Sequence, residues 1–205
     1  YGRVVIVNGV LYVPDDALGR VMGYSEVPTA SDASADFVLG KADFTDTTAT
    51  ASATTMAAPG SLATDGQRLF VTDYTNSRVL VFDTAPTTSG APASYAIGQP
   101  DLVTGTSACS ATGLNHPESV TYAAGRLIVT DTSNNRVLIW NSVPDTFGVT
   151  PDVVLGQGSF TTCVADDDDQ DGTPDAVPSA RVMDFPSDAW SDGERLVVTD
   201  SVNNR

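Results

Sequence analysis

The sequence predicts an all-β fold made of repeated four-stranded units, and three observations lead to this prediction. A segment that reads as two short apolar strands joined by a polar turn, R-L-I-V-T-D-T-S-N-N-R-V-L-I-W at residues 126–140, recurs at 68–82, at 195–205 and, in a weaker copy, at 10–24. Single residues at corresponding positions of the repeat also recur at one constant spacing along the sequence, which is the number of positions from Asp15 to Asp73 and is called the period below. No long run shows the apolar period of a helix, whereas turn-forming Gly, Pro, Ser, Thr and Asp are plentiful.

Four residues of the repeat recur at this period, and the spacing is longer at one step. These residues are Asp15, Asp73 and Asp131; Arg20, Arg78 and Arg136; Gly40, Gly98 and Gly156; and Pro28, Pro86 and Pro144. The next step, from Asp131 to Asp200, is longer than this period by eleven positions. We therefore predict an insertion between about Phe160 and Arg181.

Each period is expected to form four short strands. In the third copy these are Ser119–Ala123, Leu127–Thr130, Val137–Trp140 and Asp152–Leu155, and in the first copy they are Val4–Val7, Val10–Val13, Arg20–Tyr24 and Phe37–Leu39. The middle strands are apolar at successive positions, which is typical of strands that are covered on both faces. A radial array of stacked four-stranded sheets is a β-propeller, and its sheets are called blades.

The predicted blades occupy residues 1–58, 59–116, 117–180 and 181–205, with the last one incomplete and an acidic insertion at 161–180. About three and a half blades are therefore present. A closed ring needs at least four blades, and an open end leaves strand edges unpaired. We expect the chain to be a segment of a longer ring, or to be completed by other chains.

Composition excludes some classes of partner and favours export. The formal net charge of −16, with only ten basic residues, excludes nucleic acid, because a phosphate backbone requires a clustered basic surface. No apolar stretch approaches the roughly 20 residues that a membrane-spanning helix needs. An acidic surface suits a protein outside the cell and attracts divalent cations. We expect an extracellular, cell-surface or periplasmic location.

The repeated pattern P-x-x-hydrophobic…G-x-R-L-x-V-T-D-x-x-N-x-R-V-L resembles the NHL repeat, over Pro59–Phe82, Pro117–Trp140 and Pro186–Arg205. The trailing V-L-G-Q element at Val154–Gln157 resembles the longer form found in exported bacterial proteins with this repeat. The resemblance covers essentially the whole chain and is weakest in residues 1–60. It implies a propeller that is typically six-bladed. The same fold serves binding modules, scaffolds and some enzymes, so it does not decide the function.

The polar residues of the repeated turn are expected to be structural. Asp and Asn favour the side-chain-to-backbone bonds of a turn, and a recurring Arg is expected to bond a carboxylate or carbonyl of its own or a neighbouring blade. A catalytic group is needed once, whereas these residues recur in each blade. They are Asp73, Asn76 and Arg78; Asp131, Asn134 and Arg136; and Asp200, Asn203 and Arg205.

No arrangement of residues predicts catalysis. Propeller enzymes of the lyase or lactonase kind hold a metal in the central channel with several His or carboxylate side chains. Here the first strands read Ser61–Thr64, Ser119–Tyr122 and Ser187–Trp190, and Asp188 is their only ionisable residue. The single histidine, His116, cannot supply such a site. We therefore predict that the chain is not an enzyme and has no catalytic residue.

The insertion contains the sharpest local signal, D-D-D-Q-D-G-T-P-D at residues 167–175. The D-x-D-x-D-G-x-x-D spacing resembles the calcium loops of thrombospondin type 3 and dockerin modules. It differs from an EF-hand, because Pro178 stands where a bidentate Glu belongs. A solvated acidic run is the alternative. The predicted Ca²⁺ ligands are Asp167, Asp169, Asp171, the Thr173 carbonyl and Asp175, with Gly172 allowing the turn.

Two cysteines, Cys109 and Cys163, lie in the loops that follow the fourth strands of adjacent blades. They are not equivalent in the period, because the counterpart of Cys163 one blade earlier is Gly105. A disulfide and two free thiols are both compatible with this placement. A disulfide would fasten the insertion to its neighbour and would fit an exported protein.

The sequence thus favours a non-catalytic, calcium-binding propeller that acts as a binding or scaffold module. Its partner would be a protein, a glycan or another copy of itself. Two alternatives remain open. One is a propeller enzyme whose metal site lies in other blades, and the other is a structural subunit of a surface layer or filament.

Overall fold

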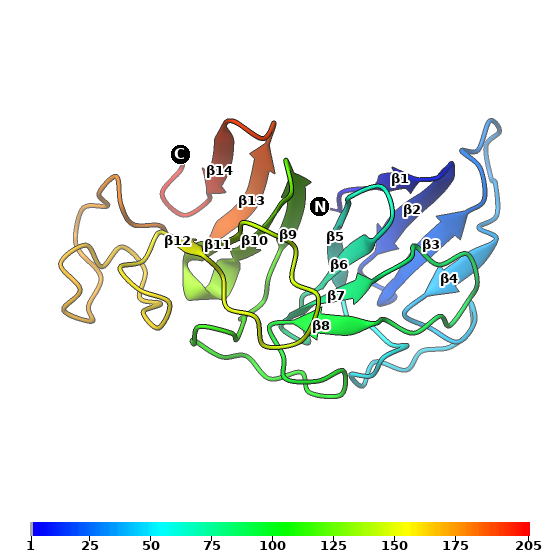
Figure 1. The fold of residues 1–205 in the computed structure, drawn as a ribbon, viewed down its shortest axis with the longest axis horizontal. Helices are drawn as coiled ribbons and strands as arrows, with labels where there is room; N and C mark the ends of the chain where they lie inside the picture. The colour runs from blue at the N-terminus through cyan, green and yellow to red at the C-terminus, as the bar shows by residue number, and fades with distance from the viewer. Residues whose placement is uncertain (1) are drawn as a thin grey trace.

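The computed structural model describes residues 2–205 as an all-β chain, with three four-stranded antiparallel sheets and one two-stranded sheet (Figure 1). Within each sheet the strands follow one another in sequence order, as in a propeller blade. The strands are β1 (Val5–Val7), β2 (Val10–Asp15), β3 (Arg20–Tyr24) and β4 (Phe37–Leu39) in blade one; β5 (Pro59–Thr64), β6 (Leu69–Asp73), β7 (Arg78–Phe82) and β8 (Tyr95–Ile97) in blade two; β9 (Ser119–Ala123), β10 (Arg126–Asp131), β11 (Arg136–Trp140) and β12 (Val153–Leu155) in blade three; and β13 (Pro186–Ser191) and β14 (Leu196–Asp200) in blade four.

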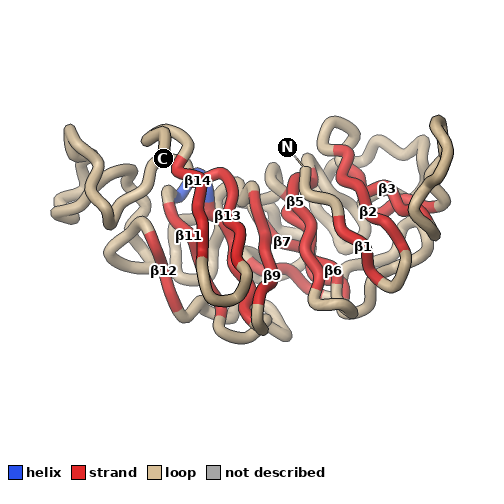
Figure 2. The backbone as a smooth tube through the Cα atoms, turned by 90° about the horizontal axis from the view of Figure 1, so that it is seen from above, coloured by secondary structure: helices blue, strands red, loops and turns tan. Residues whose placement is uncertain are grey.

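The blades form an arc. The first strands, β1, β5, β9 and β13, lie around its centre, and the fourth strands, β4, β8 and β12, lie at its outer rim (Figure 1). The first strands of neighbouring blades contact each other. Successive blades lie side by side, with loops at both ends of the strands (Figure 2). Within the part of the chain that the structure describes, no helix has the length and apolar character to cross a membrane. The predicted all-β fold and its three and a half blades are confirmed.

The core lies between the blades, which explains the continuous apolar runs. Leu69, Val71 and Leu80 of blade two are fully buried and pack in a cluster with blade one. The residues one period later, including Leu127 and Val129, are buried in a second cluster shared by blades two and three. A strand between two neighbouring sheets needs apolar side chains on both faces. The continuous apolar runs of the middle strands are therefore a consequence of the stacking of the blades.

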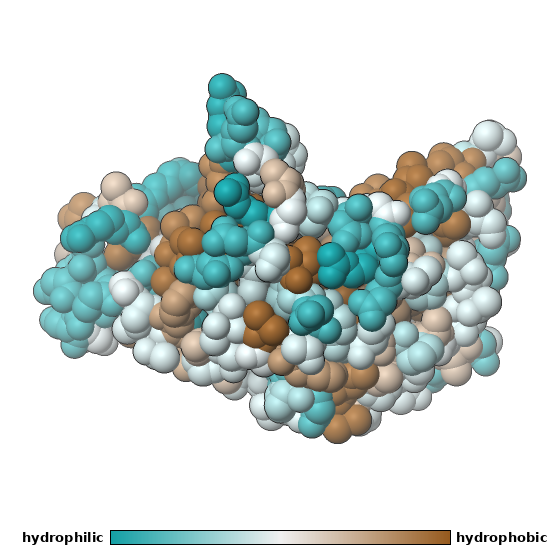
Figure 3. Space-filling view, viewed as in Figure 1, coloured by the Kyte–Doolittle hydropathy of each residue, from teal (hydrophilic) through white to brown (hydrophobic). Residues whose placement is uncertain are grey.

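The sheet faces at the two ends of the arc remain uncovered. Val4, just before β1, and Ile6, within it, are 50% and 55% exposed, and Val197 of β14 is 59% exposed. Hydrophobic surface is visible over β1 and β2 (Figure 3). Leu62, the counterpart of Val4 in blade two, is fully buried against blade one. Burial of this position thus depends on a neighbouring blade.

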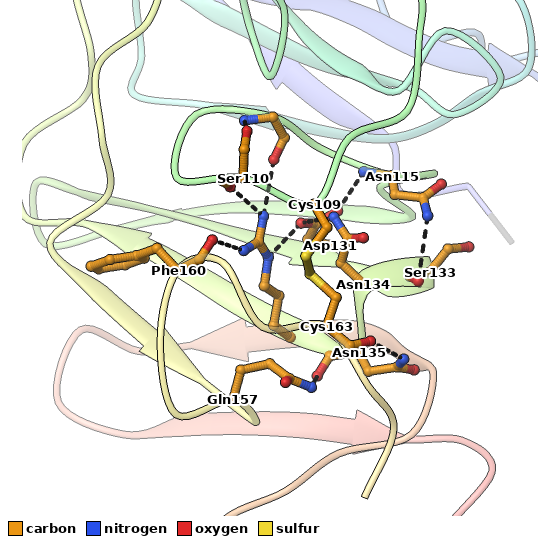
Figure 4. A network of polar contacts seen from close by, with 12 residues as sticks. Cys109, Ser110, Asn115, Asp131, Ser133, Asn134, Asn135, Gln157, Phe160 and Cys163 are labelled. Carbon is orange, nitrogen blue, oxygen red and sulfur yellow. Dashed lines mark hydrogen bonds and ion pairs between the residues drawn. A yellow bond between two sulfur atoms is a disulfide. The ribbon is translucent and has the colours of Figure 1, made fainter. Parts of the chain in front are cut away.

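A buried ion pair closes the hairpin between the second and third strands. The guanidinium of Arg136 is inaccessible to solvent, and its Nε donates to Asp131 Oδ2 at 2.7 Å. Its Nη1 donates to the Phe160 carbonyl at 2.5 Å, and its Nη2 donates to the Ser110 and Gly113 carbonyls at 2.9 and 3.0 Å (Figure 4). Phe160 follows the last strand of blade three, whereas Ser110 and Gly113 follow the last strand of blade two. One side chain therefore joins two blades.

The same joint occurs one period earlier around Arg78. Its Nε donates to Asp73 Oδ2 at 2.8 Å, and its other nitrogens donate to the carbonyls of Leu102, Ser52 and Thr55. Each of these acceptors is one period before its counterpart around Arg136. In the end blades, Arg20 and Arg205 bind their own aspartates and one loop carbonyl each. We call this arrangement the arginine joint.

The carboxylate of the joint accepts hydrogen bonds from three N–H groups. Asp131 Oδ2 accepts from Asn134 Nδ2 at 2.8 Å as well as from Arg136, and Asp131 Oδ1 accepts the Asn115 backbone N–H at 2.6 Å. Asp73 binds Asn76 and the Ala57 N–H in the same way. These bonds explain why Asp, Asn and Arg recur together. The structural role of the turn residues stays a prediction, and these contacts are the basis on which it can be tested.

A disulfide reinforces one joint. Cys109 and Cys163 are bonded, with their Cα atoms 6.2 Å apart (Figure 4). The bond connects the two loops that Arg136 also connects. At the Arg78 joint the corresponding positions are Ala51 and Gly105, so that joint has no such bond. The structure therefore decides between the two alternatives left open by the sequence in favour of the disulfide.

Replacing Arg136 with Lys is expected to lower the free energy of unfolding by about 2–4 kcal/mol, because a lysine cannot donate to the carboxylate and three carbonyls at once. The urea midpoint measures this change. Arg195→Lys, on the exposed β13–β14 turn, is the matched control and should change stability by less than about 0.5 kcal/mol. Equal midpoints for the two variants would contradict a stabilising role for the joint.

Removing the disulfide with Cys109→Ser and Cys163→Ser is expected to destabilise the fold by about 2–4 kcal/mol, because the unfolded chain regains freedom over the sequence separation of 54 between the cysteines. Thermal unfolding of the wild type with and without a reductant measures the same effect. The reductant should leave the double variant unchanged. If reduction did not shift the wild-type transition, the bond would not contribute to stability.

Candidate functional site

The acidic insertion brings three carboxylates together. One carboxylate oxygen from each of Asp167, Asp169 and Asp171 lies within 4.8 Å of the others. Asp167 is buried, whereas the other two are exposed. The hydrophilic end of the molecule at the left of Figure 3 is where this loop lies. The three residues alternate along the chain, as oxygen ligands of a hard cation do in acidic loops.

Backbone bonds hold the loop around Asp167. The N–H groups of Asp171 and Gly172 each donate to the Asp167 carboxylate at 3.0 Å. Gly172 has φ of +89°, a conformation that favours glycine and allows the chain to fold back. The Thr173 hydroxyl and N–H donate to Asp171 Oδ1 at 2.6 and 2.8 Å and lower the pKa of that carboxyl. Asp171 is therefore ionised at neutral pH.

Of the other two predicted ligands, Asp175 does not belong to the cluster of three carboxylates, and the Thr173 ligand is a backbone carbonyl. Asp175 Oδ2 accepts the Asp168 N–H at 2.8 Å, and Thr173 is engaged with Asp171 through its hydroxyl. Asp168 forms an ion pair with Arg181 at 2.9 Å. The structure thus brings the three alternating aspartates together, while Asp175 closes the base of the loop through a backbone bond.

The insertion is attached to both of its neighbours. Asp166 Oδ1 accepts from Asn203 Nδ2, in the turn after β14, at 2.9 Å. On the other side, the disulfide holds Cys163, shortly before Asp166 in the chain. Asn135 of the blade-three turn also donates to the Cys163 carbonyl at 2.9 Å. The acidic loop therefore starts from a fixed base, next to the repeated turns.

A second candidate site is a cavity of about 650 Å³ where the first strands meet. Each blade contributes one residue from the same position in the repeat, namely Arg3, Ser61, Ser119 and Asp188. Arg3 crosses the centre of the arc. Its Nη2 lies 2.6 Å from Asp188 Oδ1, and its Nη1 donates to Thr121 Oγ1 at 2.5 Å. We call this cavity the channel mouth.

The residue before each of these positions also lines the channel mouth, as Gly2, Gly60, Glu118 and Ser187. Glu118 is half-buried, and burial raises the pKa of its carboxyl. Asp16 and Tyr74 complete the polar lining. Asp188 was recognised from the sequence as the ionisable residue of a first strand, whereas Arg3 and Glu118 were not predicted to line this cavity. The repeat period is the signal that finds them, because Arg3 is in register with Ser61 and Glu118 is in register with Gly60.

Comparison with known proteins identifies the repeat. The model of the NHL repeat matches residues 114–140, which span β9 to β11. No curated protein matches the chain. Many solved structures are similar to the chain, and three of them illustrate the likeness at low identity. They are a glutaminyl cyclase from Myxococcus xanthus (13% identity, TM-score 0.46, 80% of this chain and 53% of that chain), a candidate 6-phosphogluconolactonase from Bacteroides uniformis (17%, 0.47, 98% and 63%) and a nidogen/laminin complex (17%, 0.39, 67% and 41%). The chain spans about half the length of these structures.

These comparisons correct one prediction. We expected that the chain is not an enzyme, but two of the similar structures, the glutaminyl cyclase and the candidate lactonase, are named as enzymes. The prediction rested on the scarcity of ionisable residues in the first strands. It overlooked Arg3 and Glu118, which together with Asp188 place charged side chains in the channel mouth. The exclusion of enzymes is therefore withdrawn.

The repeated joints, the stacked four-stranded sheets and the family match agree on one identification. The chain carries an NHL repeat at residues 114–140 and has the blade architecture of a β-propeller.

Proposed function

We propose that the chain is an exported propeller module that binds calcium in its acidic loop and presents the ordered loop to a partner. The observation that carries this proposal is the cluster of Asp167, Asp169 and Asp171 oxygens within 4.8 Å. Ca²⁺ takes six to eight oxygen ligands in a flexible arrangement, which a loop of alternating carboxylates can provide. The Thr173 carbonyl and Asp175 are the further ligands that the spacing suggests.

The charge of the loop supports a cation. Six aspartates lie between residues 166 and 175, and the ion pair between Arg181 and Asp168 compensates only one of them. Like charges at this spacing repel each other, and a divalent ion would relieve the repulsion. The position of the loop on a disulfide-bonded base limits how far the empty loop can move. We expect an affinity in the extracellular range of about 0.1–1 mM.

An exported location is part of the proposal. Disulfides persist in oxidising compartments, and the Cys109–Cys163 bond is part of the arginine joint next to the loop. The partner would be a protein, a glycan or another copy of the chain, bound at the face that carries the acidic loop and the repeated turns. Calcium would order this surface before the partner binds and so reduce the entropic cost of binding.

Isothermal titration tests the calcium site. Calcium added to the wild type should release or absorb heat with a midpoint near millimolar concentration, and Asp169→Ala combined with Asp171→Ala should abolish the signal, because two of three clustered carboxylates are lost. Asp83→Ala, at an exposed position after β7, is the matched control and should bind as the wild type does. The absence of heat at millimolar calcium, or an equal loss in the control, would refute the proposal.

A further inference from the structure

We propose that calcium in the acidic loop controls how firmly blade four is held against blade three, and that Asp166 is the residue that connects the loop to blade four. Such control rests on the proposed function, because it requires that the loop bind calcium. Three features of the chain point to it. They are the place of the insertion in the repeat, the contact between the insertion and blade four, and the closure of the acidic loop at Asp166.

The insertion interrupts a connection between blades that is otherwise repeated. Ala108 and Asp166 are one period apart, and each lies in the loop that follows the fourth strand of its blade. The Ala108 N–H donates to the Leu114 carbonyl at 2.9 Å, and the Asp166 N–H donates in the same way to the Met183 carbonyl at 3.3 Å. The eleven extra positions therefore lie between Asp166 and Met183. Asp166 still belongs to the repeated connection, and the acidic residues that follow it belong to the insertion.

The side chain of Asp166 replaces a backbone carbonyl in the contact with the next turn. Asn134, in the blade-three turn, donates from Nδ2 to the Ala108 carbonyl at 2.9 Å. The equivalent Asn203, in the turn after β14, donates instead to Asp166 Oδ1 at 2.9 Å. Asn203 also donates to Asp200, the carboxylate of the blade-four arginine joint, at 2.9 Å. The insertion is thus bonded to the residue that orders this joint.

The other polar contacts between blades three and four are fewer than those between blades two and three. Arg136 Nη2 donates to two carbonyls, those of Ser110 and Gly113. Arg205 Nη2 donates to the Val182 carbonyl at 2.6 Å, and among residues 2–205 it has no second acceptor. The link through Asp166 therefore carries a larger share of the polar contacts at this boundary.

Asp166 is also the residue at which the acidic loop closes. Its carbonyl accepts the Asp175 N–H at 3.0 Å, and the next residue is Asp167, the buried member of the carboxylate cluster. Calcium bound by the clustered carboxylates would hold the segment 167–175 in one conformation and keep the loop closed. Without calcium, repulsion between the carboxylates favours opening, which loosens Asp166 from Asn203. Blade four is therefore held when the loop is occupied and released when it is empty.

Hydrogen exchange of the wild type, in excess calcium and in a calcium chelator, tests this control. The Val202 N–H of the blade-four turn donates to the Asp184 carbonyl at 3.2 Å, and at the equivalent place in blade two the Thr75 N–H donates to the Ala57 carbonyl at 3.2 Å. Calcium should slow exchange of the Val202 amide about fivefold, at the lower end of the usual coupling between two sites, and leave the Thr75 amide unchanged.

The outcome separates this inference from the proposed function. If titration shows that calcium binds while the exchange of Val202 stays the same, the control of blade four is overturned and the calcium site stands. If titration shows no binding, both are overturned.

Two substitutions of Asp166 distinguish the link from general damage to the loop. Asp166→Asn keeps an oxygen that can accept from Asn203, so calcium should still slow exchange of the Val202 amide. Asp166→Ala should bind calcium about fivefold more weakly and without this slowing, because the link is lost and coupling between two sites is reciprocal. Slowing at Val202 in Asp166→Ala equal to that in the wild type would contradict the role of Asp166.

A variant in blade four tests the same coupling without changing the acidic loop. Asn203→Ala should weaken calcium binding about fivefold, because it removes the donor to Asp166. Asn76→Ala is the matched control, since Asn76 holds the equivalent position in blade two and its Nδ2 donates to Asp73 at 2.9 Å. The control should bind calcium as the wild type does. Equal calcium affinities for Asn203→Ala and the wild type would overturn the proposal.

Discussion

The arrangement of the blades depends on a buried guanidinium whose three nitrogens each have a hydrogen-bond acceptor. Removing Arg136 and Asp131 from water is costly, and their attraction offsets this cost only because every guanidinium nitrogen and both carboxylate oxygens have a hydrogen-bond partner. Weakening one partner of such a pair is destabilising, because the other partner is then left buried with unmet hydrogen bonds. The donors of Arg136 reach all of their acceptors only in one register of the hairpin and with the exit loops of the two blades in one position. Successive sheets are thereby fixed at a constant spacing, and their apolar faces meet in register.

This constraint separates structural positions from functional ones. The joint residues recur because each blade needs the same connection. The disulfide, the acidic insertion and the charged lining of the channel mouth occur once. Two of them lie together, since the disulfide holds the base of the insertion beside the joint of Arg136. The third lies at the centre of the arc, where Arg3 of blade one reaches Asp188 of blade four. The repeated residues connect the blades, and the residues that occur once are the candidates for function.

Much of the blade architecture could be predicted from the sequence, because the same strand and turn patterns recur at a constant period. Apolar runs such as Leu127–Thr130 and the Asp–Asn–Arg turns predicted the strands, the hairpins and the insertion. The kind of partner that Arg136 binds, a carboxylate or a carbonyl of its own or a neighbouring blade, could be predicted. Which backbone carbonyls accept its hydrogen bonds could not, since carbonyls leave no residue signature. Pairing of Cys109 with Cys163 stayed open because the two positions are not equivalent in the period. Glu118 was not predicted to line the cavity, because it precedes β9 in the sequence and is brought to the cavity only by the convergence of the blades.

Hydrogen exchange at the Asn115 and Ala57 amides tests the arginine joint most directly. Both amides lie outside the strands, and each donates to the buried carboxylate of a joint, at 2.6 and 2.8 Å. If the joints fasten the blades, these loop amides exchange only when the whole structure unfolds, at the rate of the Val129 amide in the core strand β10. Exchange as fast as that of the exposed loop amide of Gly148 would show that the joints open locally, and would contradict the account.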